Sequence, residues 1–379
     1  MQHNIKNNVM KINRKVLNKV RRVKASVRLF ITPNRWLIHF VSISKYITTG
    51  YKTEYPINPA TIKTPEIMNM PVFINAQHIF SEKYEYPELF TGVITGQAIF
   101  NPEYNIVLDG DHSIIIETSA TMCEGKYFDR HIITRKPTKE ILGFSTPLRS
   151  VSNNYYHVLI DLLPRLFALF HEPYTKFELI NLIYTGKLTN VEKFWLDRIL
   201  PDNVKLLNVE GGENYKLENY VYLPFLTRQF AGYLPSEYLE YVLPKALPTR
   251  PRKRCNRIYI SRKKAAYRIV RNEDELIDAL EKYGFVSYEL ENYTVEEQIN
   301  IFYDAEIVIS PHGAGLTNLI YAENCYVLEL FANSTVKPSY YTISKSVGHV
   351  YDYLCSNESW INDDFTADVD MILHKLSCR

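Results

Sequence analysis

The sequence predicts an α/β fold with two Rossmann-like domains that face a central cleft. The chain has 379 residues, which is more than one hydrophobic core ordinarily organises. After residue 255, apolar strand-like segments alternate with amphipathic helix-like segments, a pattern typical of a parallel sheet with helices on both faces. A short segment rich in proline and arginine, residues 248–254, separates this region from the αβ units that precede it.

These observations divide the chain into five segments, and a cleft between the two domains is the expected place for an active site. The predicted segments are a basic N-terminal segment (1–44), an N-terminal α/β domain (45–247), a linker (248–254), a C-terminal Rossmann-like domain (255–350) and a closing segment (351–379).

The N-terminal segment is strongly basic. Residues 1–28 contain nine lysines and arginines and no acid, and the apolar stretch that follows is interrupted by Pro33, Arg35 and His39. That stretch is too broken for a transmembrane helix or a secretion signal. Two interpretations stay open, namely a solvated basic tail and a peripheral contact with an anionic membrane surface.

The composition is that of a globular protein, with 46% hydrophobic and 23% charged residues. The formal net charge is only +2, which argues against nucleic acid as a partner. The five cysteines are widely spaced and form no C-x-x-C pair, so we expect them to be reduced. The expected location is the cytoplasm, with the basic segment able to associate with the inner face of the membrane.

The first half of the N-terminal domain is broken by prolines into short β-like pieces. Segments 105–110 and 112–118 predict two strands around an Asp-Gly turn. Asp109 and Asp111 have the D-x-D spacing that binds Mg²⁺ with sugar nucleotides, but D-G is ordinary in a hairpin turn. The second half predicts a strand, a helix, two strands and a helix, at 177–184, 190–200, 204–208, 220–223 and 235–247.

A polar face stands out on the helix expected after residue 154. Asn154 is a good N-cap, and His157 and Asp161 are four residues apart, so they share a face, with Arg165 one turn further. Pro164 should kink or break this helix because it has no N–H to donate. The alternatives are a catalytic His–Asp pair and a structural His–Asp hydrogen bond beside an exposed arginine.

The linker and the C-terminal domain follow with clearer signals. The four basic residues of 248–254 indicate either a solvated linker or a polyanion contact. Capping boxes at Asn272–Glu275 and Thr294–Glu297 predict two helix starts. We expect strands at 257–261, 285–290, 307–310 and 326–330, helices from 272 to 283 and from 294 to 305, and a closing helix at 366–377.

A glycine loop follows the strand Ile307–Ile309. Gly313 and Gly315 allow close approach to the backbone, and the loop leads into a helix start, where free N–H groups attract anions. His312 and Thr317 add side-chain donors. The loop matches neither a P-loop nor a dinucleotide G-x-G-x-x-G motif.

Further donors and acceptors are expected at the ends of neighbouring strands. Arg262 is suited to phosphate, with Lys263 or Arg268 as further candidates. Glu329 ends a strand and could accept hydrogen bonds from ribose hydroxyls; the alternative is a surface carboxylate.

These residue types suit glycosyl transfer. A His or Asp can deprotonate an acceptor hydroxyl, and backbone amides with an arginine can stabilise a leaving diphosphate without a metal. The competing hypothesis is a zinc hydrolase with His157, Asp161 and a third ligand such as His312. Because there is no H-E-x-x-H motif and no Cys/His cluster, we expect no metal site.

Five motifs together resemble glycosyltransferase family 61, the group with the capsular polysaccharide biosynthesis-type domain. Their order and spacing agree over roughly residues 150 to 331, while the region before residue 100 carries no resemblance. The motifs are N-Y-x-H-x-x-x-D-x-L-P-R at 154–165, Y-I-S-R at 259–262, N-E-x-E-L at 272–276, E-Q at 297–298, and P-H-G-A-G-L-T-N at 311–318 with V-x-E-L at 327–330. One departure is Ser310, where glycine is common.

The resemblance implies a GT-B fold and an inverting glycosyltransferase without an essential metal or cofactor, the nucleotide-sugar being a substrate. It implies donor binding in 255–350 and acceptor binding in 45–247. The expected donor is UDP-linked, the expected acceptor is a glycan, and the expected role of the protein is in surface or capsular polysaccharide synthesis. The donor sugar does not carry over. The alternative is a non-catalytic subunit that binds a nucleotide-sugar or glycan. The expected catalytic residues are His157 and Asp161, the donor-binding residues Arg262, His312, Gly313, Ala314, Gly315, Thr317, Asn318 and Glu329, and the further cleft residues Asn154 and Arg165.

Overall fold

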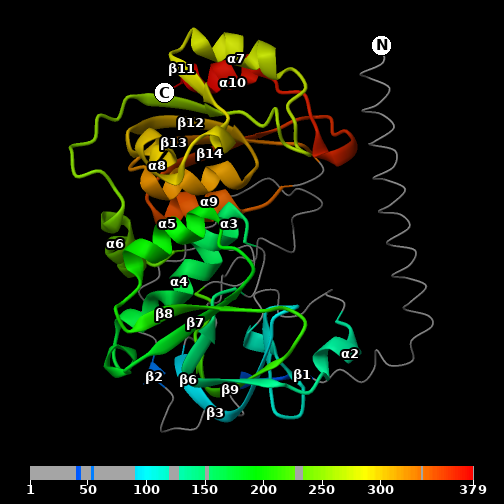
Figure 1. Ribbon diagram of the computed structural model, residues 1–379. Coiled ribbons are helices and arrows are strands. Elements are labelled where there is room, and N and C mark those ends of the chain that lie inside the picture. The colour runs from blue at the N-terminus through cyan, green and yellow to red at the C-terminus, as the bar shows by residue number, and fades with distance from the viewer. Residues whose placement is uncertain are drawn as a thin grey trace.

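Two β-sheets with a layer of helices between them organise the chain (Figure 1). The computed structural model describes residues 40–43, 53–54, 90–118, 128–149, 153–226, 234–333 and 336–378. The predicted α/β class is confirmed. Most of the basic N-terminal segment lies outside the described residues, so its membrane contact stays a prediction.

The C-terminal sheet has five strands that are all parallel, in the order β11-β10-β12-β13-β14. Its apolar residues alternate between two cores: Ile307 and Ile309 pack on one face and Val308 on the other. This alternation follows from the two-residue period of a strand whose faces are both covered. The strands are β10 (Asn256–Ile260), β11 (Phe285–Tyr288), β12 (Ala305–Pro311), β13 (Tyr326–Phe331) and β14 (Val350–Cys355).

Helices cover both faces of this sheet. In Figure 1, α7 and α10 lie above it, and α8 and α9 lie below it, toward the rest of the molecule. Order along the chain alternates strand and helix, which confirms the predicted αβ pattern. The helices are α7 (Glu273–Glu281), α8 (Val295–Tyr303), the 3₁₀ helix η10 (Ala314–Tyr321), α9 (Ser339–Ser346) and α10 (Val369–Ser377).

Of the two predicted capping boxes, one forms. Thr294 and Glu297 exchange both hydrogen bonds at the start of α8, as predicted. The prediction at Asn272 is wrong: α7 does begin after this residue, but its side chain makes no cap bond. Instead the Asn272 amide bonds the backbone N–H and C=O of Ala367, which ties α7 to the closing segment.

The N-terminal sheet is mixed, with the order β1-β5-β4-β3-β9-β6-β7-β8 and β2 paired with β3. The predicted hairpin is confirmed, because β4 and β5 pair antiparallel and Asp109 accepts the N–H groups of Asp111 and Ser113 in the turn. The strands are β1 (Phe40–Val41), β2 (Thr53–Glu54), β3 (Phe90–Asn101), β4 (Ile106–Leu108), β5 (Ile114–Ile115), β6 (Lys139–Pro147), β7 (Ile180–Thr185), β8 (Val204–Val209) and β9 (Tyr215–Tyr222).

This sheet differs from the Rossmann-like arrangement that the sequence predicted. The neighbouring pairs β9–β6, β6–β7 and β7–β8 are parallel, whereas β3 pairs antiparallel with both β4 and β9. Connection length explains part of this difference. The turns from β3 to β4 and from β4 to β5 are only a few residues long, which allows only antiparallel pairing within each of these two pairs.

Helices between the sheets share one hydrophobic core with both of them. Residues 155–170 form a continuous helical segment, described below, and Leu159 and Leu166 from it join the same apolar cluster as Leu182 of β7 and Val308 of β12. The other helices are α2 (Arg130–Ile133), α5 (Asn190–Ile199) and α6 (Ser236–Val242), and short 3₁₀ turns occur at 116–118, 174–176, 243–245, 290–292 and 361–363.

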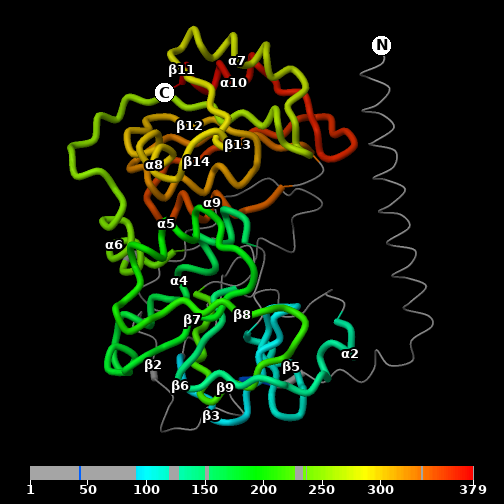
Figure 2. Tube along the Cα trace, viewed as in Figure 1, coloured from blue at the N-terminus to red at the C-terminus, as the bar shows by residue number. Residues whose placement is uncertain are grey.

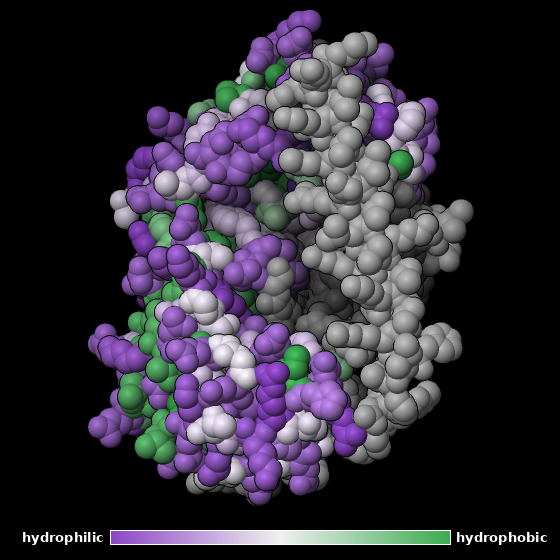
Figure 3. Space-filling view, turned by 45° about the vertical axis from the view of Figure 1, so that its right-hand side comes forward, coloured by the Kyte–Doolittle hydropathy of each residue, from purple (hydrophilic) through white to green (hydrophobic). Residues whose placement is uncertain are grey.

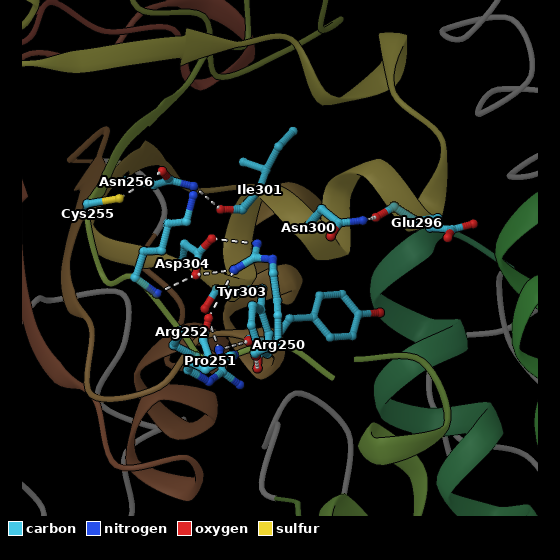
Figure 4. A network of polar contacts seen from close by, with 12 residues as sticks. Arg250, Pro251, Arg252, Cys255, Asn256, Glu296, Asn300, Ile301, Tyr303 and Asp304 are labelled. Atoms are coloured by element: carbon cyan, nitrogen blue, oxygen red, sulfur yellow. Dashed lines mark hydrogen bonds and ion pairs between the residues drawn. The ribbon is translucent and has the colours of Figure 1, made fainter. Parts of the chain in front are cut away.

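The linker is held to the C-terminal sheet by its arginines. Figure 2 shows the chain leaving α6 and running along the outside of the molecule to β10. Arg250 donates to both oxygens of Asp304, at 3.0 and 2.6 Å, and Arg252 donates to the carbonyls of Tyr303 and Tyr321 (Figure 4). The arginines of 248–254 are thus paired within the protein, while Arg250 and Arg254 stay 41% and 47% exposed, as a solvated linker would be. The polyanion contact stays a prediction. The domain boundaries themselves stay predictions.

Two further observations concern membrane crossing and the cysteines. Within the residues that the structure describes, no helix is long and apolar enough to cross a membrane. Four of the five cysteines, at 255, 325, 355 and 378, fall within these ranges and are free thiols.

Candidate active site

His157 and Asp161 form a short hydrogen bond on the helical segment between the sheets. His157 ends α3 (Tyr155–His157), and its Nδ1 lies 2.5 Å from Asp161 Oδ2. The His157 side chain is 24% exposed and that of Asp161 is 10% exposed. Because Nδ1 is engaged, Nε2 is the ring nitrogen that remains to take a proton.

A π turn carries this pair. Residues Val158–Leu162 are π-helical, and the N–H of Leu163 donates to Val158 five residues back. Pro164, which cannot donate to Ile160, follows in the turn α4 (Leu163–Arg165) and leads to a 3₁₀ turn, Leu166–Phe170. The predicted disturbance at Pro164 thus takes the form of a π turn, a feature frequent at functional sites.

Arg165 does not extend the His–Asp face. It is 2% exposed, its Nε donates to the carbonyl of Leu223 at 3.2 Å, and its guanidinium lies 4.4 Å from the Phe225 ring centre. The exposed arginine that the structural alternative assumed is therefore wrong, and the place of Arg165 in the cleft stays a prediction. The extra residue of the π turn shifts the helical phase, so that position 165 turns toward the segment after β9.

Asn154 is the N-cap of this segment, as predicted. Its side-chain oxygen accepts the backbone N–H of His157 at 2.9 Å. This bond fixes the start of the helix at the residue that carries the candidate base, so Asn154 has a clear positioning role.

The glycine loop packs against Arg262. A Cβ at Gly313 would lie 2.8 Å from the Arg262 Cζ, so only glycine leaves room for the guanidinium. A Cβ at Gly315 would lie 2.9 Å from Leu290 and 3.1 Å from Ile260. A Cβ at either glycine would thus displace a neighbouring side chain from its present position, and Ala314 between them begins η10.

His312 is bonded to Glu329, which changes the expected role of the glutamate. Glu329 Oε1 lies 2.5 Å from His312 Nδ1, and Oε2 accepts from the Tyr351 hydroxyl at 2.5 Å. Glu329 is completely buried. With no exposure, Glu329 is not the surface carboxylate of the alternative interpretation, and both of its oxygens are already bonded inside the protein. Its predicted contact with a ribose stays a prediction.

Three cations lie close enough to the loop histidine to act on it electrostatically. Burial and the neighbouring charge of Arg268 lower the pKa of both Arg262 and Lys337. Burial first, and then Arg268, Lys337 and Arg262, hold the pKa of His312 well below its usual value. The Nε atoms of Arg262 and Arg268 are buried without a hydrogen-bond partner. We call Arg262, Arg268 and Lys337 the cation cluster.

The sequence located this cluster only in part. Arg268 was one of two further candidates, and the other, Lys263, is exposed and pairs with Asp274 at 2.6 Å. Lys337 was missed, because a lone lysine before a proline resembles ordinary loop composition. A cluster of like charges in a partly buried place favours binding of an anion.

Asn318 connects the loop to the His157 helix. Its amide donates to Gln298 and to the Gly315 carbonyl, and its oxygen accepts from the Tyr155 hydroxyl at 2.6 Å. Asn318 is fully buried, so the structure gives it a bracing role in the site. Thr317 is also fully buried, and its hydroxyl has no hydrogen-bond partner.

Aromatic rings join the two histidine pairs. Tyr340 lies with its ring centre 5.1 Å from that of His312 and 5.8 Å from that of Tyr156, which in turn lies 5.4 Å from the His157 ring. Figure 3 shows the surface hollowed between the upper part of the molecule and the lower part. The structure therefore brings the sequence-predicted base and the glycine loop into one neighbourhood.

The candidate metal ligands do not assemble. Within the ranges that the structure describes, no group of three or more His, Cys, Asp or Glu side chains has a geometry that could hold a metal ion. His157, Asp161 and His312 thus form no zinc site in this structure.

Residues 155–328 match the model of the family described as Glycosyltransferase 61. The resemblance that the motifs indicated is thereby confirmed for this part of the chain. The matched residues include His157, Asp161, Arg262 and His312, while Glu329 and Lys337 lie just beyond them.

A curated relative is similar over a shorter stretch. The chain is 33% identical over 99 residues to the EGF domain-specific O-linked N-acetylglucosamine transferase of Drosophila melanogaster. The similarity covers 25% of this chain and 19% of the relative's own length.

Proposed function

We propose that this chain is an inverting, metal-independent glycosyltransferase that moves a sugar from a nucleotide-sugar, with UDP as its nucleotide, to a hydroxyl group of a glycan acceptor. The observation that carries the proposal is the cation cluster, which has unpartnered buried guanidinium nitrogens and lies at the glycine loop of a family 61 region. A diphosphate supplies acceptor oxygens for the two Nε–H groups that have no hydrogen-bond partner, and negative charge beside the three cations.

The His157–Asp161 pair is suited to the first chemical task. Asp161 orients the ring through Nδ1, so His157 Nε2 takes the proton from the acceptor hydroxyl as that oxygen attacks the anomeric carbon. An attack from the side opposite to the leaving group inverts the configuration at that carbon. Asp161 then stabilises the imidazolium that forms.

The cation cluster is suited to the second task. As the bond from the sugar to the diphosphate breaks, negative charge grows on the phosphate oxygens. Arg262, Arg268 and Lys337, together with the loop amides, are fixed donors and charges of the kind that stabilise such a leaving group without a metal.

In this proposal the two halves of the molecule are the two sides of a GT-B enzyme. Its support is the pair of parallel-rich sheets, with the anion loop at the carboxyl edge of the C-terminal one. The acceptor would be held by the N-terminal half, and the product would be a surface or capsular polysaccharide assembled at the cytoplasmic side, with residues 1–44 as a membrane contact.

A donor panel tests the proposal. UDP-linked and other nucleotide-sugars are screened by calorimetry, and those that bind are used in transfer assays with and without EDTA. UDP-N-acetylglucosamine belongs in the panel because the relative named above transfers N-acetylglucosamine. We expect binding and transfer that persist in EDTA. Loss of transfer that Mg²⁺ restores would contradict metal independence.

The alternative is a non-catalytic subunit that binds a nucleotide-sugar or a glycan. Such a protein would bind UDP but would neither hydrolyse nor transfer the sugar from any donor. The His157–Asp161 pair argues against it, because a binding subunit has no need of a base.

A further inference from the structure

Tyr351, Glu329 and His312 form a buried hydrogen-bonded chain that the transfer mechanism above leaves unused. Glu329 shares one oxygen with the Tyr351 hydroxyl and the other with His312 Nδ1, each at 2.5 Å. Glu329 is completely buried, and Tyr351 and His312 are 4% and 5% exposed. A buried carboxyl is costly unless each of its oxygens is bonded, so this arrangement fixes the position of its partners.

The orientation of the His312 ring is fixed from several directions. Its ring centre lies 5.3 Å from that of Phe331 and 5.1 Å from that of Tyr340, and its backbone N–H donates to the Leu330 carbonyl at 2.9 Å. Since Nδ1 is held by Glu329, Nε2 is the ring nitrogen left for a ligand. The loop that carries His312 continues directly into Gly313, against which Arg262 packs.

The protonation states of the pair decide what Nε2 can do. Burial raises the pKa of the Glu329 carboxyl well above its usual value. Burial and the cation cluster lower the pKa of His312 well below its usual value. Because Glu329 is completely buried and His312 is 5% exposed, the arrangement that leaves no net charge buried in the pair has the carboxyl O–H donating to Nδ1, and both pKa directions agree with it. A neutral imidazole that accepts at Nδ1 carries its own hydrogen on Nε2.

We propose that Glu329, itself bonded by Tyr351, holds His312 in the tautomer with hydrogen on Nε2, so that His312 donates to a phosphate oxygen of the bound diphosphate. The identity of that anion rests on the proposed function. The opposite tautomer would present a lone pair to the phosphate and repel it. Glu329 is thus a positioning residue that acts through His312.

Two substitutions of Glu329 separate this role from a purely structural one. In Glu329→Gln the amide N–H₂ donates to Nδ1 and the amide oxygen accepts from Tyr351, so the Nε2–H tautomer is kept. In Glu329→Leu both bonds are lost. Affinity is measured by calorimetry with inorganic pyrophosphate, which tests the anion site alone. We expect the pyrophosphate affinity of Glu329→Gln to stay within about 3-fold of that of the native chain. The affinity of Glu329→Leu should be at least about 10-fold weaker than that of the native chain.

A spectroscopic readout tests the tautomer directly. In ¹⁵N NMR of histidine-labelled protein saturated with pyrophosphate, we expect the His312 Nε2 signal of a protonated nitrogen in both the native chain and Glu329→Gln. His312→Ala identifies the signal. Glu192→Gln is the matched control, because Glu192 is also completely buried but pairs with Arg149 at 2.6 Å, and it should leave both readouts unchanged.

The outcomes separate this proposal from the proposed function. An unprotonated His312 Nε2 in the pyrophosphate complex overturns the tautomer proposal. A Glu329→Gln variant that folds but binds pyrophosphate as weakly as Glu329→Leu also overturns it. If pyrophosphate binds and Nε2 is protonated while no nucleotide-sugar is transferred, the proposed function fails and the tautomer assignment stands.

Discussion

Two histidine–carboxylate pairs with the same 2.5 Å bond at Nδ1 occupy different environments in this molecule. The His157–Asp161 pair lies on a π turn with the His157 ring 24% exposed, whereas the His312–Glu329 pair is buried beside the cation cluster. A pair that reaches solvent can exchange protons with a substrate. A pair enclosed among cations is held in one state. The surroundings of each pair, more than its residue types, are the basis on which we propose His157 as a base and His312 as a donor.

The largest expected effect comes from removing the first pair. His157→Ala and Asp161→Asn should each lower the turnover of sugar transfer by about 10²-fold or more, because general-base catalysis contributes about that much. Pyrophosphate affinity should stay near that of the native chain, because neither residue belongs to the cation cluster. Turnover with the true donor and acceptor, together with calorimetry, checks both parts.

This prediction also tests the division of roles between the pairs. Near-native turnover in both variants would remove His157 and Asp161 from the chemistry. A large loss of pyrophosphate affinity in either one would show that the two pairs do not act on separate substrates.

A smaller effect is expected from disturbing the anion side. Gly313→Ala should weaken pyrophosphate binding by about 10-fold, because the new methyl group displaces the Arg262 guanidinium, whose bonds to a charged phosphate are worth about 1.5–3 kcal/mol. Calorimetry measures the change. Lys263→Ala is the control, since this neighbouring lysine is exposed and pairs with Asp274. Equal losses in the two variants would contradict a specific role for Arg262.

Removal of the Tyr155 hydroxyl tests whether Asn318 of the glycine loop positions the His157 helix. Tyr155→Phe removes the bond to Asn318, which should lower stability by about 1 kcal/mol and turnover by several-fold, while pyrophosphate affinity is kept. Urea unfolding and steady-state kinetics measure the two effects. Tyr220→Phe is the matched control, because its buried hydroxyl has no hydrogen-bond partner. Unchanged turnover in Tyr155→Phe would mean that Asn318 does not position the His157 helix.

The smallest expected effect is a pH dependence of anion binding. Burial and Arg268 lower the pKa of Lys337, so this side chain loses its charge at a lower pH than a free lysine does. Pyrophosphate affinity should therefore fall as pH rises through the lowered pKa, and binding should take up protons in that range. Calorimetry in buffers of different ionisation enthalpy measures the uptake.

Lys337→Arg supplies the control for this titration, because a guanidinium keeps its charge over the same range. The fall in affinity with rising pH should be much smaller in this variant. An equally steep fall in the two proteins would assign the pH dependence to another group.

Much of the C-terminal fold follows from local patterns. The Thr294–Glu297 capping box starts α8 where predicted, and the strand before the glycine loop is found at Ala305–Pro311. These signals lie within a few neighbouring residues, so the sequence contains them. The order of strands in the mixed N-terminal sheet could not be predicted from local patterns, because the pairing of β3 with β9 joins residues more than 100 positions apart.

Local residue patterns were enough to predict the α/β class, the resemblance to family 61, the His157–Asp161 pair and the glycine loop. Each depends on residue types at short, fixed spacings. Three features became visible only in the folded chain: Arg165 bonds the segment after β9, Glu329 bonds His312 and Tyr351, and Lys337 lies near Arg268. The physical reason is that a buried polar group takes the partner that packing places beside it, and packing joins segments whose separation along the chain carries no pattern.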